Sequence, residues 1–359
     1  MSALYRSLRP VLFALSPEFS HELTLSALRL LGGGAVASSL FGKGVSDPYT
    51  ALGLQFPNRV GLAAGLDKNG AAIPAMSAMG FGFIEVGTVT PLPQPGNPKP
   101  RLFRLRHEQA IINRMGFNNC GSAALLDNVR RAREVMKLSA ASGASPAVLG
   151  INIGKNKNTP PESANDDYLQ GLEAAYKAAD YVTINVSSPN TSGLRDLQFG
   201  EQLDALLFAL REKRKLLEDI EAVRKPLLVK VAPDMEDDAL CRVADRLLHF
   251  GVDGVIATNT TLARDAVQSS VYANEAGGLS GLPLQQKATH SIRVLSAHAG
   301  DALTIMGVGG IDSGASAIEK IHAGAHLVQL YSGLIYRGPG LVGECAGAIA
   351  ALRQENCKG

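Results

Sequence analysis

Polar side chains follow short apolar runs at several points along this chain of 359 residues. The first run leads into Gly65-Leu66-Asp67-Lys68, another carries Asn185 and leads into Ser187-Ser188-Pro189-Asn190, and a later one delivers Thr258-Asn259-Thr260-Thr261. Such ammonium, amide and hydroxyl groups suit the binding of a planar anion, and a cation among them can stabilise charge that develops on a cofactor ring. The residue types favour a cofactor-dependent enzyme with a small anionic substrate.

Lys230 is the most informative of these groups because it lies inside an apolar run, between Val229 and Val231. An unpaired charge buried among apolar side chains is very costly. We therefore expect the Lys230 ammonium to point into a polar cavity rather than into the core.

Glycine-rich segments in the last third of the chain are candidate phosphate-binding loops. Gly309-Gly310 is followed by Asp312-Ser313-Gly314, and Tyr331-Ser332-Gly333 follows the next apolar run. Glycine lets backbone N–H groups approach an anion, and βα barrels often bind phosphate after their seventh and eighth strands. A further segment, Gly277–Gly281, is either a similar flexible amide-rich loop or an ordinary turn.

Other chemistries lack the residues they need. There is no G-x-S-x-G elbow for a serine hydrolase, and none of the seven histidines closes an apolar run. The four cysteines lie far apart and no H-x-H pair occurs, so neither a metal site nor a disulfide framework is expected. The formal net charge of +2 is too small for a nucleic-acid-binding surface, so no nucleic-acid partner is expected.

The elements that must position these groups are short strands alternating with amphipathic helices. The helical segments include 201–220, 237–250, 284–297 and 315–323, and this alternation is typical of a parallel sheet. The eight strand-like runs are 60–64, 83–87, 148–152, 182–186, 227–231, 254–258, 303–308 and 327–330. Eight βα units predict a closed (β/α)8 TIM barrel, and the G-x-G-x-x-G turn of the alternative, an open doubly wound sheet, is absent.

The N-terminal segment has a different pattern. Leucines at helical spacing on both sides of Pro17 predict a helical hairpin, and the Gly- and Ser-rich stretch from Gly32 to Pro48 is interpreted as a linker. We expect residues 1–45 to form a helical extension with its linker and residues 46–359 to form the barrel. The hairpin could cap the barrel, form a dimer contact or lie on a membrane surface, but no apolar run reaches the roughly 18 residues that span a bilayer.

Long motifs in order along the whole chain resemble the dihydroorotate dehydrogenase family. They include Gly61-Leu-Ala-Ala-Gly-Leu-Asp-Lys68, Ile112-Asn-Arg-Met-Gly-Phe-Asn-Asn119, Gly150-Ile-Asn-Ile-Gly-Lys-Asn156, Asn185-Val-Ser-Ser-Pro-Asn-Thr191 and Ile256-Ala-Thr-Asn-Thr-Thr261. The resemblance implies an FMN-dependent barrel that oxidises dihydroorotate to orotate in pyrimidine synthesis. Ser188, in place of the cysteine of the soluble class 1 enzymes, and the N-terminal extension resemble class 2, whose members pass electrons to a membrane quinone.

The resemblance also implies roles for individual residues. Ser188 would be the catalytic base, with Phe117 and Thr191 lining a water relay that carries its proton outward. FMN would contact Ala64, Gly65, Lys68, Thr88, Asn152, Asn185, Lys230, Thr258, Gly281, Gly310, Tyr331 and Ser332. Substrate would contact Lys68, Asn113, Arg114, Met115, Gly116, Phe117, Asn185, Asn190, Asn259 and Thr260.

The same resemblance places the quinone site near His21, Arg104 and Tyr331. It implies a bacterial enzyme held peripherally on the cytoplasmic side of the inner membrane, as a monomer or weak dimer. A soluble enzyme that reduces fumarate or NAD, and a barrel that binds flavin without catalysis, are the alternatives.

Overall fold

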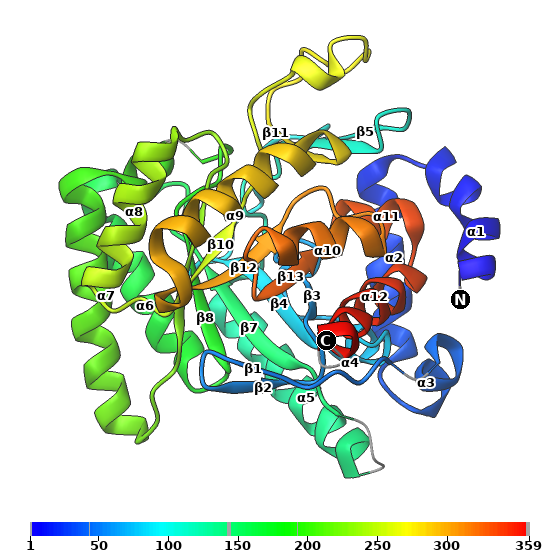
Figure 1. Ribbon diagram of the computed structural model, residues 1–359, viewed down its shortest axis with the longest axis horizontal. Coiled ribbons are helices and arrows are strands. Elements are labelled where there is room, and N and C mark those ends of the chain that lie inside the picture. The colour runs from blue at the N-terminus through cyan, green and yellow to red at the C-terminus, as the bar shows by residue number, and fades with distance from the viewer. Residues whose placement is uncertain (1, 43, 142–144, 192, 357–359) are drawn as a thin grey trace.

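Eight parallel strands form a closed barrel in the computed structural model, which describes residues 2–42, 44–141, 145–191 and 193–356 (Figure 1). Its strands, in order around the barrel, are β10 (Gly254–Ala257), β12 (Thr304–Val308), β13 (Leu327–Leu330), β3 (Val60–Leu62), β4 (Phe83–Val89), β7 (Val148–Ile153), β8 (Tyr181–Asn185) and β9 (Leu227–Val231). All eight predicted runs are confirmed as barrel strands.

Helices surround the barrel and bury their apolar faces against it. They are α4 (Ile73–Ala78), α5 (Gly121–Ala141), α6 (Ala164–Tyr176), α7 (Gly200–Glu221), α8 (Asp237–His249), α9 (Gln285–Ala299), α10 (Gly314–His322), α11 (Ser332–Arg337) and α12 (Gly340–Asn356). Short 3-10 turns occur at Pro161–Ser163, Arg195–Gln198, Asp265–Val267, Leu282–Leu284 and Gly300–Ala302. The four predicted helical segments are confirmed as α7 to α10, with ends that differ by one or two residues.

A small hairpin closes the amino end of the barrel. Its strands are β1 (Tyr49–Ala51) and β2 (Leu54–Phe56), and the Phe56 ring packs edge-on against Phe83, with 5.4 Å between centroids. Phe83, Val148 and Tyr181 begin their barrel strands and belong to the same buried cluster as Phe56. Apolar packing fills this end, so only the carboxyl end of the barrel is left for a polar site.

A second sheet lies at the carboxyl end and was not predicted. Antiparallel strands β5 (Leu102–Leu105), β6 (Ala110–Asn113) and β11 (Gly278–Gly281) pair in the order β11-β6-β5. The interpretation of Gly277–Gly281 as a loop or turn is therefore wrong over 278–281, which form β11. These residues become a strand because β6 offers a paired edge, in the register Gly278 to Asn113.

The N-terminal helices lie together on one side of the barrel, near α11 and α12 (Figure 1). They are α1 (Ser2–Ala14), α2 (Pro17–Leu31) and α3 (Ala35–Phe41). The predicted helical hairpin is confirmed as α1 and α2, with a proline at the start of α2, where its missing N–H has no helical partner to lose. The linker interpretation of 32–48 is wrong over 35–41, which form α3.

No helix in the described part of the chain is long and apolar enough to cross a membrane.

Candidate active site

A cavity of about 960 Å³ opens at the carboxyl end of the barrel strands. Its walls hold every residue predicted to contact cofactor or substrate except Asn152 and Arg114, and they also hold Ser188. The polar lining comes from eight regions of the chain, which contain Lys68, Thr88, Asn113, Ser188, Lys230, Asn259, Ser280 and Tyr331. Separate strand ends therefore converge on one cavity, as in other small-molecule sites at the carboxyl end of a βα barrel.

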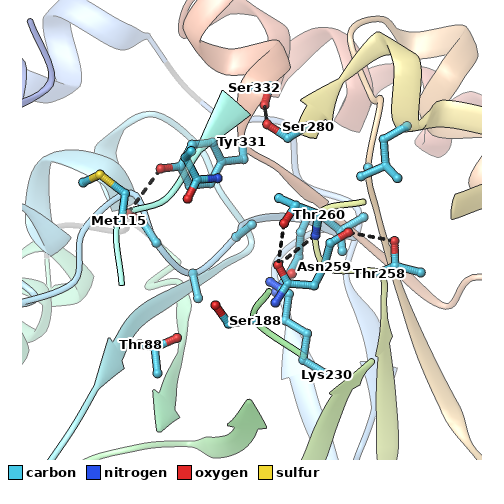
Figure 2. Close-up of a pocket in the computed structure, with 18 of the residues that line it drawn as sticks. Thr88, Met115, Ser188, Lys230, Thr258, Asn259, Thr260, Ser280, Tyr331 and Ser332 are labelled. Atoms are coloured by element: carbon cyan, nitrogen blue, oxygen red, sulfur yellow. Dashed lines mark hydrogen bonds between the residues drawn. The ribbon is translucent and has the colours of Figure 1, made fainter. Parts of the chain in front are cut away.

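Ser188 lies in the loop after β8 and is 5% exposed. Its Oγ accepts a hydrogen bond from the backbone N–H of Asn190 at 3.3 Å. Figure 2 shows the Ser188 hydroxyl and the Lys230 side chain beside the same open space. The hydroxyl is thus accessible from the cavity while it is nearly excluded from bulk water.

Lys230 is the buried cation that the sequence predicted. It is 6% exposed, lines the cavity, and its Nζ makes no hydrogen bond or ion pair with any described residue. Burial lowers the pKa of its ammonium, and the nearby Glu85 partly offsets that effect. An ammonium left without a protein partner in a cavity is suited to pairing with an anionic ligand.

Glu85 organises the barrel interior directly beneath the cavity. This fully buried carboxyl group accepts hydrogen bonds from Asn152 at 2.8 Å, from Gln329 at 3.0 Å and from the Tyr181 and Thr183 hydroxyls, each at 3.1 Å. Sequence reasoning missed Glu85, although a charged residue within an apolar strand is the signal that identified Lys230.

Asn152 lies behind the cavity wall and supports Thr88, which lines it. Its side-chain oxygen accepts from the Thr88 hydroxyl at 2.6 Å, and the Thr88 hydroxyl accepts from the Asn185 amide at 2.8 Å. Together with Glu85 these residues form one continuous chain of hydrogen bonds, which fixes the two groups that do line the cavity. Asn152 does not itself line the cavity, and its predicted cofactor contact stays a prediction.

Arg114 is the other predicted residue outside the lining. Its guanidinium donates to Glu275 at 2.5 Å and lies over the Phe103 ring, 4.6 Å from the centroid. Its backbone neighbours Asn113 and Met115 do line the cavity. The Arg114 side chain therefore joins the segment between β10 and β11, which contains Glu275, to β5 of the second sheet. A substrate contact by Arg114 stays a prediction.

The two predicted relay residues lie close to Ser188. Phe117 lines the cavity with Ser188 and adopts a φ of 52°, in the left-handed region that residues other than glycine rarely occupy. Thr191 is 6% exposed and follows Ser188 by three positions. Their role in proton transfer stays a prediction.

A second cavity of about 1040 Å³ lies between the N-terminal helices and the barrel. Helices α1 and α2 contribute nine of its twenty lining residues, and the lining is mostly apolar. His21, Arg104 and Tyr331, the predicted quinone residues, all line it. Burial, with a smaller contribution from Lys68, lowers the pKa of His21 to about 4, so this imidazole is neutral at pH 7. Met115 and Tyr331 line both cavities, so the two cavities share part of a wall.

The fold and the paired cavities define a class of protein: a βα barrel with a polar ligand site at the carboxyl ends of its strands and a separate apolar site beside it. Residues 48–352 match the family model described as dihydroorotate dehydrogenase. The enzyme named dihydroorotate dehydrogenase (quinone) of Stutzerimonas stutzeri is 54% identical over 352 residues, covering 98% of this chain and 99% of the relative. The enzyme of the same name from Chromobacterium violaceum is 55% identical over 351 residues, with 98% and 99% covered.

Solved structures agree with this match. The crystal structure of DHODH from Eimeria tenella in complex with ferulenol superposes with a TM-score of 0.84 at 37% identity, covering 94% of this chain and 92% of that one. The chain therefore belongs to the dihydroorotate dehydrogenase family, flavin enzymes that oxidise dihydroorotate to orotate in pyrimidine biosynthesis. Within that family it matches the quinone-dependent members.

The cavity has unpaired groups that fit a flavin. Besides the Lys230 ammonium, the buried Oε1 of Gln329 has no hydrogen-bond partner among the described residues, and both residues line the cavity. A flavin ring offers an N–H donor to such an acceptor and takes up negative charge that such a cation stabilises. Gly309, Gly310 and Gly333 line the same cavity and bring backbone amides to one side of it.

Proposed function

We propose that this protein binds FMN in the polar cavity, oxidises dihydroorotate to orotate there, and passes the electrons to a membrane quinone held in the second cavity. The observation that carries the proposal is the convergence of Ser188, Lys68, Lys230 and four asparagines on one cavity that shares a wall with the apolar cavity. When bound, FMN supplies the acceptor for hydride from C6 of dihydroorotate and the donor of electrons to quinone. Anaerobic addition of dihydroorotate should bleach the flavin, and addition of quinone should restore its colour.

In this proposal Ser188 is the catalytic base that removes a proton from C5 of dihydroorotate. Its hydroxyl is nearly excluded from bulk water and receives an N–H from Asn190, a donor that stabilises negative charge on Oγ. Phe117 and Thr191 line the route by which the proton leaves. Lys230 stabilises the negative charge that accumulates on the cofactor ring.

The asparagine side chains of the cavity and Lys68 are proposed to orient the substrate. Asn113, Asn185, Asn190 and Asn259 line the cavity and present both donors and acceptors, as a pyrimidine ring and its carboxylate require. Lys68 Nζ donates to the Gly65 carbonyl at 2.9 Å and keeps two further protons for an anionic ligand.

Orotate binding should weaken as the pH rises above about 8. Burial and then Arg101 lower the pKa of Lys68 to about 8, so above this pH the free enzyme loses the cation that meets the anion. We expect the orotate dissociation constant, measured by calorimetry, to be flat below pH 7.5 and to rise by up to about tenfold per unit above pH 8. Lys68→Arg keeps its charge and should flatten the profile to pH 10; an unchanged profile in this variant would contradict the role of Lys68.

The phosphate of FMN is proposed to bind the amides around Gly310 and Gly333. A Cβ added to Gly310, whose φ is +73°, would lie 2.4 Å from Gln285 Cα, so Gly310→Ala must displace this loop. We expect the purified variant to contain severalfold less flavin per chain, measured by absorbance. Gly343→Ala is the matched control because nothing lies within 4 Å of its added Cβ, and equal flavin loss in both variants would contradict the assignment.

The N-terminal helices are proposed to rest on the cytoplasmic face of a bacterial inner membrane. Eight of the eighteen exposed large apolar side chains among the described residues fall within the first 40 positions, Leu4, Leu8 and Val11 of α1 among them. An exposed apolar face of this kind suits the headgroup boundary of a bilayer, where quinone is also dissolved. Co-sedimentation of the full chain with lipid vesicles tests this placement.

A further inference from the structure

A buried ion pair joins the N-terminal hairpin to the barrel. Glu18 of α2 is 9% exposed and Arg101, just before β5, is 6% exposed. Glu18 Oε1 accepts from Arg101 Nε at 3.0 Å and from Nη2 at 2.7 Å. A pair so well shielded from solvent is sensitive to the loss of either partner, because the other charge is then left buried without compensation.

The rest of the Arg101 guanidinium holds a loop that contacts the substrate side of the cavity. Arg101 Nη1 donates to the backbone carbonyls of Pro95 at 2.6 Å and Asn97 at 2.8 Å. One edge of the guanidinium thus donates to Glu18 of the N-terminal hairpin, and the other edge donates to loop 95–97. The fixed planar fork of arginine suits this role, since it aims its donors in both directions at once.

Loop 95–97 in turn packs on the backbone that lines the active site. Asn97 donates from its backbone N–H to the Met115 carbonyl at 3.1 Å, and from its side-chain amide to the carbonyls of Arg114 at 3.0 Å and Asn190 at 3.4 Å. A Cβ on Gly96 would lie 2.3 Å from the Met115 oxygen, so the two segments have no space between them. Asn190 follows the catalytic serine by two positions, and Met115 lines the cavity.

We propose that Glu18 is a positioning residue for the dihydroorotate pocket, acting through Arg101 and Asn97 on the segments that contain Met115 and Asn190. This inference rests on the proposed function, because it adds a residue to the substrate pocket named there. The N-terminal hairpin then has two roles: it lines part of the apolar cavity, and through Arg101 it supports the wall of the polar one.

The expected effect is on substrate binding rather than on chemistry. Neutralising Glu18 leaves the Arg101 charge uncompensated near Lys68, so the guanidinium shifts toward water and loosens loop 95–97. The KM for dihydroorotate should rise by more than kcat falls, because Ser188 and Lys230 make no direct hydrogen bond with Glu18 or Arg101 among the described residues. The network reaches Ser188 only indirectly, through the long 3.3 Å hydrogen bond from the Asn190 N–H. A network of packed and hydrogen-bonded groups transmits effects of about 2- to 30-fold.

The test compares Glu18→Gln with Glu22→Gln in the full-length, flavin-loaded protein. Both carboxylates lie on α2 and both contact Lys99, at 3.3 Å and 3.2 Å, but Glu22 is 58% exposed and does not contact Arg101. With a soluble dye as electron acceptor, Glu18→Gln should raise the KM for dihydroorotate, and the orotate dissociation constant measured by calorimetry, by about 2- to 30-fold. Its kcat should stay within about twofold of the parent, and Glu22→Gln should match the parent in all three quantities.

A second variant, Arg101→Lys, keeps the positive charge but loses the fork that reaches Pro95 and Asn97, so it should raise the same two constants at least as much. Unchanged KM and orotate binding in Glu18→Gln, or an equal rise in Glu22→Gln, overturns the inference. A fall in kcat with constant KM overturns it too, since that places Glu18 in the chemical step. If the parent protein itself fails to oxidise dihydroorotate, the proposed function fails instead, so the two failures are distinguishable.

Discussion

Ser188→Ala should lose about 10²- to 10⁴-fold in turnover of dihydroorotate, the usual contribution of a general base. The substitution removes only a hydroxyl from a loop, and the amides, Lys68 and Lys230 that line the cavity remain. Flavin content and orotate affinity should therefore stay near those of the parent. Stopped-flow measurement of flavin reduction tests the expected loss of rate. Separate measurements of flavin content and orotate binding test whether the cavity is otherwise unchanged.

Ser188→Cys is the matched variant, because a thiol also ionises and is close in size to a hydroxyl. It should retain more activity than Ser188→Ala, and its activity should reach its maximum at lower pH than that of the parent, since a thiol ionises more readily than an alcohol. Parent-like flavin reduction in Ser188→Ala would remove Ser188 from the role of base.

The barrel strands were predictable because each is buried on both faces. Parallel barrel strands read as continuous apolar runs, and all the residues of β7 or β9, for example, are buried. The polar residues at their carboxyl ends then had to meet at one rim. This geometric rule is why most of the predicted site residues line a single cavity without any knowledge of tertiary contacts.

Elements that exist because of a distant partner were not predictable in this way. Strand β11 contains two glycines in four residues and has no strand pattern of its own, yet it pairs with β6, more than 160 positions earlier. Helix α3 lies in a stretch whose Gly and Ser content suggested a linker. Both segments were predicted from local composition alone, and in the folded chain their packing against distant residues determines the secondary structure instead.

The same limit applies to side chains that act behind the site. Asn152, Glu85 and Asn97 support Thr88, Gln329 and Asn190 of the cavity wall through hydrogen bonds that span 64, 244 and 93 positions of sequence. The ion pair of Glu18 and Arg101 spans 83 positions. Position at a strand end identifies the side chains that contact a ligand. The residues that hold those side chains in place are distant in sequence, so only the folded structure reveals them.

Leu25→Trp should abolish most electron transfer to a long-chain quinone while it spares reduction of a soluble dye. Leu25 of α2 lines the apolar cavity, and an indole there would occupy the space proposed for the quinone. A quinone displaced by even an ångström from the wall formed by Met115 and Tyr331 can lose about 10²-fold in rate. Steady-state turnover with quinone and with dye, on the same preparation, measures the difference.

Leu30→Trp is the control, because Leu30 lies on the same helix and is 88% exposed, so the new ring projects away from the cavity. Its quinone and dye activities should equal those of the parent. Equal loss of both activities in Leu25→Trp would instead mean that the new ring displaces α2 and disturbs the barrel, and the KM for dihydroorotate would then rise through Glu18. Unimpaired quinone turnover in Leu25→Trp would contradict the assignment of this cavity to quinone.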